Sequence, residues 1–108
     1  WLENLCAVMR QEDHFKGGVE RMQKLACRTP GHLCKCFQKY LRRTPTDFVN
    51  ELRLNQAARL LADSHKQILE IADELNFQSL SRFYHVFRKY YGMAPAAYRK
   101  LHAGERSV

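Results

Sequence analysis

The block that decides the fold reads Phe37-Gln38-Lys39-Tyr40, then Thr44-Pro45, then Phe48. Fifty positions later the chain reads Phe87-Arg88-Lys89-Tyr90, then Ala94-Pro95, then Tyr98. Aromatic, basic and proline positions therefore recur with the same spacing. A repeat of this length indicates two copies of one structural unit.

The match extends upstream of both blocks. Leu33 corresponds to Phe83 at the same spacing of fifty. Further upstream the spacing is forty-nine, and the matched pairs are Val19 with Ile68, Met22 with Ile71, and Ala26 with Leu75. The second copy has therefore gained one residue between its two matched parts, where a turn is expected.

Apolar residues recur at helical spacing almost throughout, and no segment alternates strictly between apolar and polar residues. The sequence therefore predicts an all-α chain with seven helices. Thr29-Pro30 and Thr44-Pro45 each place a capping threonine before a proline in the first turn, so a helix is expected to begin at each. Ser79 and Pro95 are expected to open two further helices, and Gly92 is expected to end one.

The apolar stripes predict which way the helices face. The first helix contains Leu2, Leu5, Cys6 and Met9, and it is expected to end before Phe15. The stripe of the helix after Thr29 contains Leu33, Cys36, Phe37 and Tyr40. The stripe of the helix after Ser79 contains Phe83, Phe87 and Tyr90, and Tyr98 is also expected in the core.

Each copy is predicted to be a short helix, a tight turn and a longer helix with a polar outer face, which is the pattern of a helix-turn-helix. We expect one domain over residues 1–108, with helix-turn-helix units at about 16–43 and about 67–101 and a linker helix at about 45–62. A helix of about nineteen residues spans roughly 28 Å. Because major grooves on one face of B-DNA recur about every 34 Å, this linker is compatible with two reading helices in adjacent grooves.

The net charge of +7 is unevenly distributed. No acidic residue occurs between Glu20 and Asp47 or between Glu74 and Glu105. The basic residues singled out in these two stretches are Arg21, Lys24, Arg28, Lys35, Lys39, Arg42, Arg43, Arg82, Arg88, Lys89, Arg99 and Lys100. Such a segregated positive field favours a polyanion, with double-stranded DNA first. A membrane surface comes second, but no single helix sets a basic face opposite a continuous apolar one.

The second copy also carries a recognisable set of residues: Ile71-Ala72, Asn76-Phe77, Ser79, Phe83, Phe87, Tyr90, Gly92, Pro95 and Tyr98-Arg99. With this set the chain resembles the DNA-binding domain of the AraC/XylS family of bacterial transcription regulators. The stretches Leu52-Arg53-Leu54 and Ala57-Ala58-Arg59-Leu60-Leu61 resemble the linker helix of that family. The resemblance covers nearly everything from Trp1 to Lys100. More loosely, Trp1-Leu2, Phe15 with Gly17-Gly18, and Arg28-Thr29 are similar to the regulators of bacterial chitobiose-utilisation operons.

The resemblance implies two helix-turn-helix units joined by a helix, usually at the C-terminus of a longer regulator. The N-terminal part of such regulators often senses a small molecule and can dimerise, whereas the present fragment is expected to be monomeric. The DNA-bound domain often activates transcription through contacts with RNA polymerase. The first copy departs from the family pattern at Gln23, which stands where the second copy has Ala72.

The outward faces of the two longer helices are the candidate reading surfaces. The first presents Gly31, His32, Cys34, Lys35 and Gln38, and the second presents Leu80, Ser81, Arg82, Tyr84 and His85. By resemblance, Gly31, Cys34 and Lys35 match base-contacting positions, and Ser81, Arg82 and His85 match base or phosphate contacts. Lys39, Arg88 and Lys89 are expected to hold phosphates. Arg42 and Arg43 are either phosphate contacts or part of a charged loop.

The chemistry of these side chains suits base reading. Arg82 leads, because arginine to guanine is the commonest specific contact. Lys35 can donate to guanine O6 or N7, or to a phosphate instead. Cys34 can touch a thymine methyl or be a small, partly buried residue. Leu80 can make the same contact or tuck under the turn, and Gly31 allows close approach without reading a base.

Other functions are less favoured by the sequence. His32, Cys34 and Cys36 superficially resemble metal ligands, but Cys34 and Cys36 lie two apart without a second pair. We therefore expect no metal site and four free thiols in a reducing cytoplasm. Neither a glycine-rich phosphate loop nor a catalytic pair in a cleft is predicted, so we expect no enzyme and no cofactor. No apolar run is long enough to span a membrane. The expected function is sequence-specific DNA binding that regulates a sugar or catabolic operon. The alternative is a helical module that docks RNA polymerase and binds DNA without sequence preference.

Overall fold

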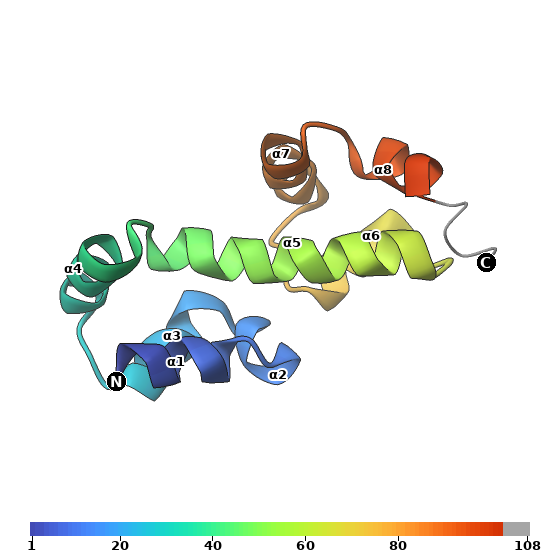
Figure 1. Ribbon diagram of the computed structural model, residues 1–108. Coiled ribbons are helices and arrows are strands. Elements are labelled where there is room, and N and C mark those ends of the chain that lie inside the picture. Colours follow the sequence, from blue (N-terminus) through green and yellow to red (C-terminus); the bar gives the residue numbers. More distant parts are fainter. Residues whose placement is uncertain (103–108) are drawn as a thin grey trace. The chain divides into compact units, whose positions relative to one another are not determined.

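A computed structural model describes residues 1–102, and every regular element in that part of the chain is an α-helix. The helices are α1 (Leu2–Met9), α2 (Glu12–Phe15), α3 (Gly18–Ala26), α4 (Pro30–Leu41), α5 (Pro45–Asp63), α6 (Ile68–Glu74), α7 (Leu80–Tyr91) and α8 (Pro95–His102), labelled in Figure 1. The predicted all-α class with two helix-turn-helix units and a connecting helix is confirmed. None of the helices in residues 1–102 has both the length and the apolarity to cross a bilayer.

The described part has one helix more than predicted, because the first predicted helix is interrupted. α1 ends at Met9, and Gln11 takes an extended conformation with φ −74° and ψ 136°. The chain then forms the single turn α2, which places Phe15 in the core with 3% of its surface exposed. The first helix ends before Phe15, as predicted, but the separate turn α2 was not predicted.

The helix starts follow the predicted capping chemistry. Thr29 Oγ1 accepts a hydrogen bond from the backbone N–H of His32 at 3.2 Å, and Ser79 Oγ accepts one from that of Arg82 at 3.0 Å. Thr44 Oγ1 accepts from the backbone N–H of Asp47 at 3.0 Å. Each bond satisfies an N–H group that has no partner within its helix, and so fixes where the helix begins.

Left-handed residues lie at matching positions of the two copies. Cys27, after α3, has φ 53°, and its counterpart Asn76, after α6, has φ 61°. Arg42, after α4, has φ 55°, and its counterpart Gly92, after α7, has φ 75°. The backbone therefore repeats as well as the sequence, and Gly92 ends α7 as predicted.

The chain forms two compact units, Trp1–Arg53 and Leu54–Val108, and α5 contributes to both. In the first unit α1, α2 and α3 pack against one another. Met9, Met22, Leu33 and Phe37 are fully buried there. The rings of Phe37 and Phe48 meet edge to face, with centroids 5.6 Å apart. These apolar contacts hold α4 onto the unit through one face only, which leaves its opposite face at the surface.

In the second unit α7 packs against α6 and α8. Leu61, Ile71, Leu75, Phe83 and Phe87 have no exposed surface. The ring of Phe87 also contacts Tyr91, with centroids 4.6 Å apart, and Tyr98 edge-on at 5.6 Å. Burial of these aromatic rings anchors α7 along one stripe, as in the first unit.

Two predicted core tyrosines lie at the surface. Tyr40 is 65% exposed and Tyr90 is 48% exposed, so both predictions were wrong. The stripe of α7 steps by four residues from Phe83 to Phe87 and then to Tyr91, whose hydroxyl donates to Asn55 Oδ1 at 3.0 Å. Because adjacent helical residues point about 100° apart, Tyr90 then faces outward. Tyr98 and Cys36 are half-buried rather than core.

A half-buried arginine positions the start of α3 in the first unit. Arg53 Nη2 donates to the carbonyl oxygen of Lys16 at 2.8 Å. Burial lowers the pKa of the Arg53 guanidinium. Gly18 has φ 71°, and a Cβ there would lie 2.8 Å from Arg53 Nη2. The left-handed backbone therefore favours glycine at this position, and any side chain would also have to displace the guanidinium.

A second arginine holds the end of α5 in the second unit. Arg99 Nε donates to the carbonyl oxygen of Leu61 at 3.0 Å, and Arg99 Nη2 donates to that of Ser64 at 3.4 Å. These carbonyls belong to the last turn of α5 and the residue after it, where helical partners run out. Arg99 therefore works within the fold, although by sequence it counted toward the basic field.

Candidate nucleic-acid interface

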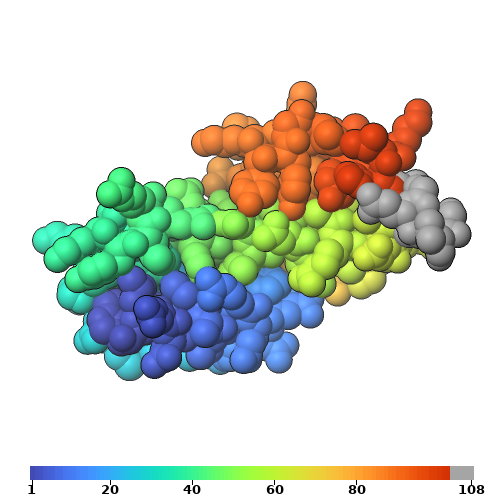
Figure 2. All heavy atoms as spheres, in the orientation of Figure 1, coloured from blue at the N-terminus to red at the C-terminus, as the bar shows by residue number. Residues whose placement is uncertain are grey.

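The outer face of α4 carries the first group of predicted site residues. Gly31, His32, Cys34, Lys35 and Lys39 are all exposed. The side chains of α4 lie at the surface of the first unit in Figure 2, where they are coloured green to cyan. The buried pair Leu33 and Phe37 fixes the rotation of α4, so the predicted residues share the surface that remains.

The outer face of α7 carries the second group. Ser81, Arg82, His85, Arg88 and Lys89 are exposed. Four of these, with Tyr84, line a surface hollow of 590 Å³; the four are Ser81, His85, Arg88 and Lys89. Leu80 is half-buried at the helix start, which agrees with the alternative that it tucks under the turn. Tyr84 is also half-buried, with its ring 6.3 Å from that of Phe83.

The positive charge of both faces is not neutralised within the described part of the chain. In residues 1–102 the salt bridges join Lys16 to Glu12 at 3.3 Å, Lys66 to Glu74 at 2.7 Å, and Arg43 to Glu51. None of these bridges involves a predicted contact residue of α4 or α7. The cations on those helices therefore remain available to an anionic partner.

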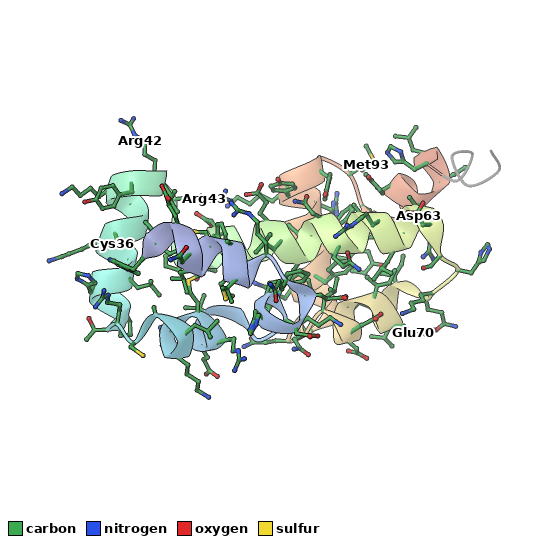
Figure 3. The ribbon with its side chains drawn as sticks, turned by 60° about the horizontal axis from the view of Figure 1, so that its bottom comes forward. Cys36, Arg42, Arg43, Asp63, Glu70 and Met93 are labelled. Atoms are coloured by element: carbon green, nitrogen blue, oxygen red, sulfur yellow. The ribbon has the colours of Figure 1, made fainter. Side chains whose placement is uncertain are left out.

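The two loop arginines after α4 separate clearly. Arg43 pairs with Glu51 and donates to the carbonyl oxygen of Asp47 at 3.3 Å, so it belongs to the start of α5. Arg42 is exposed and extends away from the ribbon (Figure 3). Of the two, only Arg42 projects as a phosphate contact would.

The faces of α4 and α7 combine an open glycine position with cationic hydrogen-bond donors. A Cβ built on Gly31 would meet nothing within 4 Å, so this position is open for close approach of a partner. Lys35 and Arg82 place cationic donors on surfaces of helical curvature that fit a major groove. The caps at Thr29 and Ser79 hold the first turns in which Gly31 and Arg82 stand.

Sequence reasoning missed a cluster beside the N-terminal half of α4. The Trp1 ring stacks on the His32 ring, with centroids 5.9 Å apart and an interplanar angle of 23°. The Arg28 guanidinium lies over Trp1 at 4.5 Å. His32 Nε2 also lies 3.6 Å from Cys36 Sγ. The four-residue spacing of His32 and Cys36 within α4 is the signal that these two side chains share one side, but Arg28 precedes the helix and nothing in the spacing points to Arg28 or Trp1.

Comparison with known proteins agrees with this geometry. Residues 23–101 match a family model described as a helix-turn-helix domain. A crystal structure of a transcriptional regulator from Chromobacterium violaceum, described as containing an AraC-type DNA-binding domain, superposes with a TM-score of 0.75 at 26% identity, over 90% of this chain and 88% of that one. The chain belongs to the AraC/XylS family. Members of this family are DNA-binding transcription regulators and not enzymes, as predicted.

Two curated relatives illustrate the AraC/XylS similarity. The melibiose operon regulatory protein of Escherichia coli K12 is 43% identical over 72 residues, which is 67% of this chain and 24% of that protein. An uncharacterised helix-turn-helix regulator of Haemophilus influenzae is 33% identical over 96 residues, which is 89% of this chain and 32% of that protein. The chain thus spans a third or less of the length of these relatives.

The candidate nucleic-acid interface consists of the outer faces of α4 and α7, which share three features. α4 and α7 follow turns with matching left-handed residues, begin at hydroxyl caps and expose basic outer faces. Gln23 in α3 is half-buried where its counterpart Ala72 in α6 is buried, so the first unit accommodates the bulkier side chain at its edge.

Proposed function

We propose that this AraC/XylS domain reads double-stranded DNA with two recognition helices, α4 and α7, placed in adjacent major grooves. The proposed units are residues 16–43 and 67–101, with residues 45–62 as the connecting helix. Regulation of bacterial transcription follows from DNA binding. Because bacterial DNA lies in the cytoplasm, the proposed compartment is the cytoplasm.

The observation that carries the proposal is the repeated design of α4 and α7. Each helix is anchored by a buried apolar stripe, begins at a hydroxyl cap and exposes cations that pair with no acid in residues 1–102. A helix presented in this way fits the width of the major groove. Two such helices in one chain support two reading heads rather than one.

The proposed contacts divide into base reading and phosphate binding. Lys35 and Arg82 donate to guanine, Ser81 and His85 contact a base or a phosphate, and Cys34 touches a thymine methyl. Phosphates are bound by Lys39, Arg88 and Lys89, and by the exposed backbone at the helix starts. His32 and Leu80 complete the surface at its edges, and Gly31 permits close approach.

A sugar or catabolic operon is the proposed target. The melibiose operon regulatory protein shares 43% identity with this chain over 72 residues, and that relative is named for a sugar operon. Expression of candidate operons in a strain lacking the full-length regulator tests this part of the proposal. Unchanged expression of every sugar operon and every other catabolic operon would reject it.

RNA polymerase is the proposed protein partner of the full-length regulator. The first unit has a hollow of 830 Å³ lined in part by Trp1, Arg10, Tyr40 and Leu41. Tyr40 and Leu41 are 65% and 38% exposed, and exposed apolar groups beside a hollow are typical of protein docking surfaces. Loss of activated transcription in vitro by Y40A with unchanged DNA affinity is the expected result. Unchanged activation would place the polymerase contact elsewhere.

Selection of duplexes from a random library, followed by anisotropy titration at two salt concentrations, tests DNA reading. Two recognition helices require enrichment of an asymmetric site spanning two adjacent major grooves. Affinity should fall with salt at a logarithmic slope of about −0.9 per phosphate contact. A site covering one groove would remove one helix from the proposal. Binding without enrichment would favour the polymerase-docking module with only non-specific DNA affinity.

A further inference from the structure

Cys36 contacts His32 on α4, and the proposed DNA contacts give Cys36 no role. The two residues stand one helical turn apart, with His32 Nε2 3.6 Å from Cys36 Sγ. Cys36 is half-buried rather than core, and it is labelled on α4 in Figure 3. A thiol makes only weak hydrogen bonds, so the contact itself contributes little to the fold.

The separation of the two atoms matches the bite of a tetrahedral metal site. Zinc binds cysteine sulfur at about 2.3 Å and histidine nitrogen at about 2.0–2.1 Å. At a tetrahedral angle those two bonds place sulfur and nitrogen about 3.5 Å apart. The observed separation of 3.6 Å is close to this value. A linear arrangement would need about 4.3 Å, which the pair does not have.

The neighbouring Trp1 ring favours this geometry. It stacks on the His32 ring at 5.9 Å, which restricts how the imidazole can turn. Arg28 lies over the far side of this stack, on Trp1 at 4.5 Å, and its positive charge works against a bound cation. Because His32 is exposed, an ion can reach the pair from solvent. Residues 1–102 contain no group of three or more metal-ligating side chains, so solvent must complete the coordination.

We propose that His32 and Cys36 form a two-ligand site for a thiophilic d10 metal ion, of which Zn²⁺ is the probe. On binding, the Cys36 S–H bond breaks, its proton passes to solvent, and a metal–sulfur bond forms. His32 donates the lone pair of Nε2 and keeps its proton on Nδ1. The site uses the i, i+4 pair and not the Cys34–Cys36 pair, because residues two apart on a helix face different directions. The site does not depend on DNA binding.

The test titrates the reduced 108-residue chain with Co²⁺ as a coloured probe and then with Zn²⁺ as competitor. A thiolate-to-cobalt absorption band that Zn²⁺ abolishes is expected. Trp1 is the chain's one tryptophan, so its fluorescence should change at the same metal concentrations. Circular dichroism of every variant verifies that α4 remains folded.

Three variants locate the ligands. C36S should abolish the band, and H32N should weaken binding at least about tenfold, since even outer-shell changes cost 10–100-fold. C34S is the matched control, because Cys34 is an exposed thiol on the same helix and should leave the titration unchanged. A band that persists in C36S, disappears in C34S or is unaffected by H32N would overturn the proposal.

Discussion

Substitution of Gly31 by alanine separates the stability of α4 from its role in binding. Gly31 is the second residue of α4, and a Cβ there would meet nothing within 4 Å. The position is helical, so alanine fits without strain. Alanine stabilises a helix by about 0.5–1 kcal/mol relative to glycine. The main reason is that an unfolded chain with alanine has less conformational entropy to lose on folding. G31A should therefore fold at least as stably as the parent chain.

The same methyl group should weaken DNA binding. If DNA approaches the backbone at Gly31, the added group displaces a neighbouring contact of about 1–3 kcal/mol. This loss corresponds to roughly a fivefold to hundredfold lower affinity for the selected duplex. Anisotropy titration measures the affinity, and thermal unfolding followed by circular dichroism measures the stability.

Gly92 provides the matched control for G31A. A Cβ at Gly92 would also meet nothing within 4 Å, but its φ of 75° lies in the left-handed region. G92A should therefore lose about 1–2 kcal/mol of stability by strain alone. Unchanged DNA affinity in a stable G31A variant would refute close approach at Gly31. A large loss of stability in G31A would refute the packing argument.

Three further substitutions test the second unit. R82A should bind the selected duplex about 1–3 kcal/mol more weakly and lose preference at one base position, whereas R59A removes the same charge from an exposed site on α5 and should change affinity little in the same titration. S79A removes the acceptor of the N–H group of Arg82 and should lower the free energy of unfolding by about 1 kcal/mol in urea, and an unchanged midpoint would show that the cap contributes nothing. Y91F removes a hydroxyl that donates to Asn55 Oδ1 and should cost about 0.5–1.5 kcal/mol, with no change in DNA affinity per folded molecule.

The sequence predicted the helical class well because its signals are local. Thr29, Thr44 and Ser79 each accept a hydrogen bond from a backbone N–H group only three residues further along the chain. These caps can therefore be predicted from the local sequence. The break between α1 and α2 was missed, because no proline or glycine marks Gln11. The break places Phe15 in the core, and the burial of Phe15 depends on residues of the unit that are distant in sequence.

Rotation of a helix is harder to predict when two aromatic residues are adjacent. Tyr90 and Tyr91 both continue the stripe of Phe83 and Phe87, at spacings of three and four residues. Contact with Asn55 and Tyr98 selects Tyr91, and neither contact can be seen in a local pattern. Tyr40 followed the same reasoning and also lies at the surface.

The exposed faces of α4 and α7 were predicted because exposure is what remains once the buried stripe is known. Lys35 and Arg82 needed no further information. The contact between His32 and Cys36 was missed because Cys36 was assigned to the stripe with Leu33 and Phe37. A residue at the edge of a stripe can turn either inward or along the surface, and only packing decides.

The residues with a left-handed backbone conformation should make local unfolding easier in one copy than in the other. At the two matched positions the second copy has asparagine and glycine, which tolerate this conformation, whereas the first copy has Cys27 and Arg42. Each ordinary side chain held there costs about 1 kcal/mol. Local unfolding around α4 therefore costs less free energy than local unfolding around α7. The amide hydrogens around α4 should exchange with solvent sooner than those around α7. The substitutions C27N and R42G would copy Asn76 and Gly92 into the first unit, and they should therefore slow the exchange of amide hydrogens around α4.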